Sequence, residues 1–168
     1  MDNDLGVYIE QLQLMAFFAG YPLIYAFVNV LSAKQSKDAF LNRLFRIMPY
    51  AYALCGALFL GYFLKTLYPD YSIENISKEL SYLKIWALLS LLFWLSPFSK
   101  RPVISLLHSF VFFFFLLRDL FMYMISMTSI DVIRNDMRVY FDSILLNTGT
   151  LIVILALHII LRKFRKSS

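Results

Sequence analysis

Long apolar runs, separated by short polar segments, form the main pattern of this chain. Three runs, Leu12 to Leu31, Ile47 to Leu67 and Ile104 to Ser126, are long enough as helices to cross about 30 Å of hydrocarbon. Two further runs, Ile85 to Phe98 and Ile144 to Leu161, are shorter, and the first of them is short enough to lie obliquely or to thin the bilayer. We therefore predict an all-α, polytopic integral membrane helix bundle of five transmembrane helices.

The polar segments set the expected bounds within a single transmembrane domain, residues 1–168. The helices are predicted over residues 8–32, 47–68, 82–98, 102–128 and 142–162. The segment 33–46 reads as a short amphipathic helix on the cytoplasmic membrane surface, because its apolar residues share one face and its basic residues lie largely elsewhere. Residues 69–81 and 129–141 are predicted as outer loops.

Composition supports a membrane protein and excludes several other classes. Hydrophobic residues make up 60% of the 168 residues and the mean hydropathy is +0.67, which lies outside the range of globular domains. The single cysteine, Cys55, excludes an intrachain disulfide and a cysteine-rich metal site. Few cysteines, short loops and frequent Phe, Ile and Lys fit the inner membrane of a bacterium.

The distribution of basic residues predicts the orientation. If the loops alternate between the two sides, ten of the 16 Lys and Arg residues fall on one side, in the first loop, the third loop and the tail. Because basic residues near span ends are retained in the cytoplasm, we expect the N-terminus outside and the C-terminus inside. The formal net charge of +5 then needs no nucleic-acid partner, since basic segments bind the anionic lipid of the cytoplasmic leaflet.

Small residues and a proline mark the first helix. Ala16 and Gly20 have the four-residue spacing that lets two membrane helices approach closely. Pro22 lacks a backbone N–H and clashes with the carbonyl of Phe18, so we expect a kink there. Such a kink serves as a hinge in some transporters, but it is also an ordinary feature of membrane helices whose neighbours satisfy the freed backbone groups.

A second set of small residues predicts a packing face on the second helix. Ala53, Ala57 and Gly61 recur every four residues and form a flat stripe. Another helix of the same bundle, or another chain, is expected to pack against it.

Two opposite charges end the apolar run FVFFFFLLRDLFMYM. Arg118 lies 16 residues past Pro102, about 24 Å along the helix and therefore near the outer boundary of the hydrocarbon. Adjacent helical residues point about 100° apart, so we expect Arg118 and Asp119 to have separate partners. Other polar side chains expected at this depth are Glu10, Gln13, Lys65, Asp142 and Asn147. These side chains form either an outward-facing polar pocket for an anionic group or structural ion pairs between helices.

The two histidines are the remaining candidates for chemistry. His108 and His158 are both predicted within the cytoplasmic leaflet, where facing imidazoles could hold a haem b or share a metal. Nothing else in the sequence supports that interpretation, and no catalytic or phosphate-binding motif occurs, so we assign no catalytic residue, metal or cofactor.

Three functional hypotheses follow from these patterns. The leading one is a non-enzymatic accessory or assembly subunit of a membrane complex, with another membrane protein or a second copy as partner. The alternative is a small oligomeric transporter or channel that uses the outer polar pocket. The third is a haem-binding protein or an intramembrane enzyme.

Overall fold

Helices make up almost all of the part of the chain that the computed structural model describes, namely residues 2–34, 39–126 and 130–167, and this part contains no strand. The predicted all-α fold is therefore confirmed. In chain order the elements are α1 (Asp2–Phe18), α2 (Tyr21–Lys34), α3 (Ala39–Leu67), α4 (Ile73–Glu79), α5 (Tyr82–Leu88), the 3₁₀ helix η1 (Leu89–Trp94), α6 (Ser96–Ser99), α7 (Pro102–Ser126) and α8 (Ile130–Ser167).

Four helical stretches within these described residues are long and apolar enough to cross a membrane. They are Tyr8–Ala33, Phe40–Leu67, Pro102–Asp119 and Met137–Phe164. The predicted third helix corresponds to a shorter apolar stretch, Tyr82–Trp94, made of α5 and η1. A 3₁₀ helix rises about 2.0 Å per residue instead of about 1.5 Å, so η1 lengthens this segment by about 3 Å.

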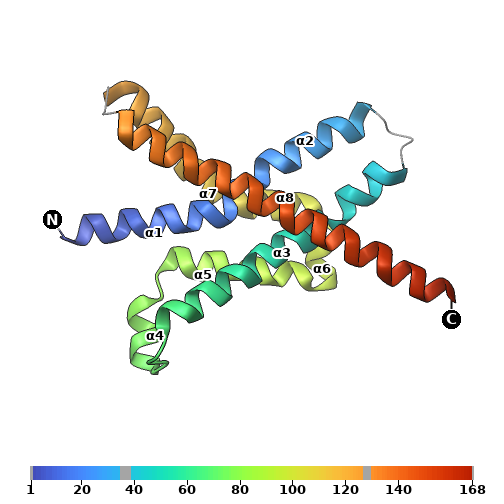
Figure 1. The fold of residues 1–168 in the computed structure, drawn as a ribbon, viewed down its shortest axis with the longest axis horizontal. Coiled ribbons are helices and arrows are strands. Elements are labelled where there is room, and N and C mark those ends of the chain that lie inside the picture. The colour runs from blue at the N-terminus through green and yellow to red at the C-terminus, as the bar shows by residue number, and fades with distance from the viewer. Residues whose placement is uncertain (1, 35–38, 127–129, 168) are drawn as a thin grey trace.

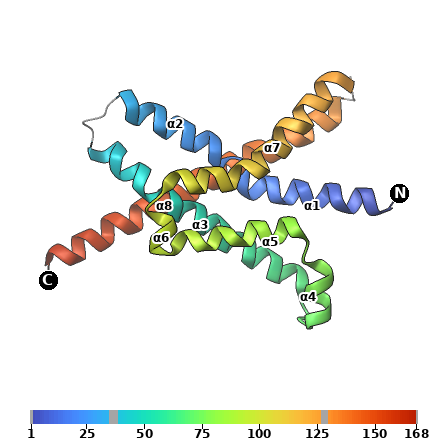
Figure 2. The ribbon, with the colours of Figure 1, turned by 180° about the vertical axis from the view of Figure 1, so that it is seen from behind.

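The helices cross near the middle of the bundle and diverge toward both ends (Figures 1 and 2). The core lies at this crossing, where Phe18, Tyr52 and Phe59 are fully buried together with Phe93 and Phe112. The rings of Phe18 and Phe112 stack with their centroids 4.8 Å apart. Aromatic packing between the helices therefore holds the centre of the bundle together.

The first predicted helix is interrupted at Ala19 and Gly20, just before Pro22, and continues as α2. Pro22 is the second residue of α2, a position at which the missing N–H leaves no hydrogen bond unmade. The backbone groups around the break bind α8: the N–H of Gly20 donates to Ser143 Oγ at 2.8 Å, and the carbonyl of Phe17 accepts from Asn147 Nδ2 at 2.8 Å. The interruption is thus fixed by a neighbouring helix.

Residues 33 and 34 of the predicted surface helix over 33–46 end α2, and residues 39–46 are the first two turns of α3, while residues 35–38 lie outside the described part of the chain. Pro49 lies inside this 29-residue helix and does not end it. Leu41 and Met48, seven positions apart, are both buried, so one apolar face runs across the proline. The prediction of a boundary at residue 47 gave the charged residues before it too much weight.

The predicted outer loop over 129–141 is also helical from Ile130, where α8 begins. At 38 residues and about 1.5 Å per residue, α8 is about 57 Å long, much more than the hydrocarbon thickness. Residues 130–141 contain no glycine or proline that would end a helix. The other predicted outer loop, 69–81, contains the short helix α4.

The bundle has one end that is rich in basic residues. The end of α2, the start of α3, the start of α7 and the end of α8 lie there (Figure 1). The basic residues of these elements and of the segment that joins α6 to α7 include Arg43, Arg46, Lys100, Arg101 and Arg162. We call this the basic end. The start of α1, α4, the end of α7 and the start of α8 lie at the opposite end. Which end faces the cytoplasm stays a prediction from the charge pattern.

Candidate functional site

The two charges at the end of the apolar run of α7 bind each other. Arg118 Nη2 lies 3.2 Å from Asp119 Oδ1, and Arg118 Nε donates to the same oxygen at 3.3 Å. The guanidinium also lies over the ring of Phe115, 5.7 Å from its centroid, and reaches Gln11 of α1 at 3.5 Å. The expectation of separate partners was wrong, because the long arginine side chain curls back to its neighbour despite the 100° between their directions.

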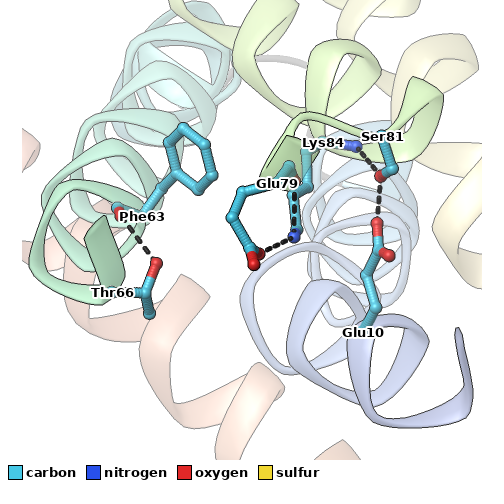
Figure 3. A network of polar contacts seen from close by, with 6 residues as sticks. All are labelled: Glu10, Phe63, Thr66, Glu79, Ser81 and Lys84. Carbon is cyan, nitrogen blue, oxygen red and sulfur yellow. Dashed lines mark hydrogen bonds and ion pairs between the residues drawn. The ribbon is translucent and has the colours of Figure 1, made fainter. Parts of the chain in front are cut away.

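Glu10 has a different partner at the same end of the bundle. Its carboxylate accepts a hydrogen bond from Ser81 Oγ, which itself accepts from the backbone N–H of Lys84 and caps α5 (Figure 3). Lys84 Nζ donates to the carbonyl oxygen of Glu79 at 2.7 Å and lies over the ring of Phe63 on α3. This network joins α1, α5 and α3, so Glu10 is a structural link between helices.

Asn147 lies inside the bundle and joins three helices. Its Nδ2 donates to the carbonyls of Phe17 on α1 and Ser143 on α8, each at 2.8 Å. Its Oδ1 accepts from the thiol of Cys55 on α3 at 3.2 Å, and that sulfur lies 3.3 Å from Thr150 Oγ1. Asn147 therefore does not belong to a pocket with Arg118. Sequence analysis missed Cys55 as its partner, because nothing in the sequence pairs residues 92 positions apart.

Asp142, one of the predicted pocket residues, lines a cavity between α3 and α8. It is exposed, and among the residues that the structure describes it makes no hydrogen bond or ion pair. The cavity has a volume of about 580 Å³. Its lining is otherwise almost entirely apolar and includes Leu54, Leu58, Leu145, Leu146, Gly149 and Val153. We call this cavity the α3–α8 groove.

Glycines beside the groove leave it open. A Cβ atom added at Gly149 or at Gly61 would meet nothing within 4 Å. The predicted packing stripe is therefore divided: Ala53 is fully buried and Ala57 is half-buried, but Gly61 is exposed. Only the part of the stripe near Ala53 is covered by the bundle itself.

Other glycines carry the close helix contacts within the chain. A Cβ at Gly20 would lie 2.7 Å from backbone atoms of Ser143 and Ile144, and one at Gly56 would clash with Ser90 Oγ. Gly20 thus packs against α8 as its spacing predicted, whereas the close contact on α3 is made by Gly56, one position before Ala57.

The two histidines lie in different surroundings. His108 Nδ1 is 2.8 Å from the hydroxyl of Tyr52, and its ring stacks on Trp86 with centroids 4.7 Å apart. His158 is exposed and lines a cavity at the basic end, to which His108 does not contribute. The imidazoles do not face each other, and the described residues contain no group of three His, Cys, Asp or Glu side chains placed to hold a metal.

The α3–α8 groove brings the predicted site residue Asp142 together with an open glycine, Gly149. Along α8 it runs from Asp142 to Val153, about 16 Å, from the end of the apolar stretch toward its middle. Asp142 and Gly149 are seven positions apart and therefore share one face of α8. This spacing is visible in the sequence and could have indicated the groove. Comparison of the chain with protein-family models, with curated proteins and with solved structures finds no match.

Proposed function

We propose that this integral membrane protein is a non-enzymatic accessory or assembly subunit of a membrane complex, and that a transmembrane helix of another protein fills the α3–α8 groove. The observation that carries the proposal is the combination of a carboxylate, Asp142, that has no partner among the described residues with an open glycine, Gly149, on the same face of α8.

The physical argument begins with the cost of the carboxylate. An ionised side chain at the centre of a membrane helix costs about 2.5–3.5 kcal/mol on insertion scales, and less toward the boundary, where Asp142 lies. Such residues usually face a partner or a water-filled cavity. A helix that offers a basic or amide side chain to Asp142 removes part of that cost.

The glycine supplies the close approach. Apolar side chains gain nothing by leaving lipid for another apolar surface, so membrane helices associate through close packing and interhelical hydrogen bonds. Gly149 allows a neighbouring backbone to come near, and the hydrogen bond to Asp142 sets the register two turns away.

The test is purification of the tagged full chain from its native membrane in a mild detergent. We expect an unrelated membrane protein to copurify in a fixed ratio with the wild type, and to be lost with Asp142→Asn and with Gly149→Leu. Ala26→Leu is the matched control for Gly149→Leu, because Ala26 is an exposed residue of α2 outside the groove. Copurification that survives both groove variants would refute the assignment of the groove.

The alternative function is a small transporter or channel. The same purification distinguishes it from an accessory subunit, because a transporter or channel is expected to yield only oligomers of this chain. The geometry favours the subunit, because the residues of the predicted polar pocket lie in separate contacts: Arg118 with Asp119, Glu10 with Ser81 and Asn147 in the core.

The orientation and membrane form part of the same proposal. We propose a multi-pass protein of a bacterial inner membrane, with the basic end in the cytoplasm, since basic segments are retained on that side. Reporter fusions after Asp4 and after Ser168 test this. A reporter that works only in the cytoplasm is expected to be active at the second position and silent at the first, and the reverse would invert the orientation.

A further inference from the structure

A larger cavity lies at the basic end, away from the α3–α8 groove. Its volume is about 740 Å³, within the range of about 300–1,000 Å³ typical of small-molecule sites. Its walls come from four places: the first turns of α3, the last residue of η1, the segment that joins α6 to α7, and the last turns of the apolar stretch of α8. A smaller cavity of about 420 Å³ shares Arg46 and His158 with it and adds Arg43.

One side of the large cavity carries positive charge. Arg46 of α3 and Lys100, between α6 and α7, both line it. Neither makes an ion pair or hydrogen bond to any residue that the structure describes, and no carboxylate lines either cavity. A guanidinium binds phosphate oxygens with two parallel hydrogen bonds, and an ammonium adds a compact charge, so together they suit a phosphate-type anion.

The α8 wall of the cavity is mostly apolar, with His158 as its one polar side chain. Ile154, Leu157 and Leu161 line it from one face of α8, at spacings of three and four residues. Tyr50 and Trp94 also line it and are the kinds of side chain found at the boundary between hydrocarbon and head groups. A free anion would gain nothing from this apolar wall. An amphiphile can place its head group against the basic residues and its hydrocarbon chain against the apolar ones.

We propose that this cavity binds one anionic amphiphile, whose phosphate-type head group lies between Arg46 and Lys100 and whose hydrocarbon chain lies along Leu157 of α8. Basic pockets between transmembrane helices bind phospholipid head groups by this chemistry. The site differs from general attraction to an anionic surface, to which Arg162 and Lys163 of the C-terminal turns contribute without lining the cavity.

The experiment uses the fluorescence of Trp94 and lipids brominated in the acyl chain. The full chain is reconstituted in phosphatidylcholine vesicles that contain a low fraction of brominated phosphatidylglycerol or, in a parallel sample, brominated phosphatidylcholine. Subtracting the signal of Trp94→Phe isolates Trp94 from Trp86. We expect the anionic quencher to act at least fivefold more strongly at equal fraction, since one basic residue near an anionic surface contributes about fivefold in affinity.

Two charge-matched variants test where this preference arises. Arg46→Gln with Lys100→Gln is expected to reduce the preference to less than twofold. Arg162→Gln with Lys163→Gln removes the same net charge from the same end and is expected to retain it. Equal losses in both variants, or no preference in the wild type, would overturn the proposal. Unchanged far-UV circular dichroism confirms folding of each variant.

A third variant and a soluble competitor test the amphiphile itself. Leu157→Trp fills the apolar side without changing the charge. Its Trp94 signal is obtained by subtracting the signal of the double variant Leu157→Trp with Trp94→Phe, and this signal is expected to show no preference for the anionic quencher. Glycerol 3-phosphate, a soluble anion of related chemistry, is expected to leave the quenching unchanged at millimolar concentration. Displacement of the lipid by glycerol 3-phosphate would show a site for free phosphate compounds and would overturn the assignment to an amphiphile.

Discussion

Adding one methyl group at Gly20 is expected to destabilise the bundle strongly, because Gly20 is where the break between α1 and α2 touches α8. The added Cβ would lie 2.7 Å from the backbone of Ser143 and of Ile144. Backbone atoms cannot rotate away as the end of a side chain can, so the two helices must separate. Overpacking of this kind costs about 1–3 kcal/mol.

The same movement breaks a hydrogen bond. The N–H of Gly20 donates to Ser143 Oγ at 2.8 Å in a buried position, and such a bond contributes about 0.5–1.5 kcal/mol. Gly20 lies in the break and not inside a helix, so alanine brings little gain in helix propensity. We therefore expect Gly20→Ala to lower the free energy of unfolding by about 2–4 kcal/mol.

The chain supplies its own control for this substitution. Gly149→Ala makes the same chemical change inside α8, but the new Cβ meets nothing within 4 Å. Alanine is favoured over glycine in a helix interior by about 0.8–1.0 kcal/mol, so this variant is expected to be as stable as the wild type or slightly more stable. Unfolding in mixed micelles with increasing dodecyl sulfate, followed by far-UV circular dichroism, measures both.

Equal stability of the Gly20→Ala and Gly149→Ala variants would refute the reasoning, since it would mean that the break does not touch α8. A double-mutant cycle gives an independent check. Ser143→Ala removes only the acceptor, so the double variant Gly20→Ala with Ser143→Ala is expected to lose about 1 kcal/mol less than the sum of the single losses.

Three further predictions concern polar groups. Asn147→Leu removes the hydrogen bonds of Asn147 to two backbone carbonyls and to the Cys55 thiol, which keeps only its contact with Thr150, and is expected to cost about 2–4 kcal/mol in the same unfolding assay. Ser90→Ala is expected to be neutral or stabilising, because the buried hydroxyl of Ser90 has no hydrogen-bond partner among the described residues; a loss above about 1 kcal/mol would contradict this. Double-mutant cycles are expected to give a coupling of about 0.5–1 kcal/mol between Arg118 and Asp119 and none between Arg118 and Asp142.

Hydropathy was enough to predict the fold class and the short third helix, because the lipid core requires long apolar stretches with internally bonded backbones. It failed where a helix extends beyond the hydrocarbon. Residues 130–141 carry four charged side chains of mixed sign and were predicted as a loop, yet they belong to α8 because no glycine or proline interrupts them. Charge shows where a segment leaves the membrane, and it does not show where a helix ends.

The partners of the polar side chains could not be predicted for a different reason. Depth along a helix can be counted from the sequence, and it correctly grouped Glu10 with Arg118 near one end. Which side chains then meet depends on how the helices are rotated and inclined, and a serine at position 81, not Arg118, reaches Glu10. Flexible side chains add a second uncertainty, as the contact between Arg118 and Asp119 shows.

The outcome for the acidic residues has a consequence for assembly. Glu10 and Asp119 both have partners within the chain. Glu10 binds Ser81, which caps α5, and Asp119 pairs with Arg118 of the same helix. Asp142, which the sequence predicts at a similar depth, lines the α3–α8 groove and has no partner among the described residues. Lipid offers a carboxylate neither a charge nor a hydrogen-bond donor. The groove around Asp142 is therefore where a second protein would bring the largest gain, which is why we place the interface there and not on the other exposed apolar faces of α8.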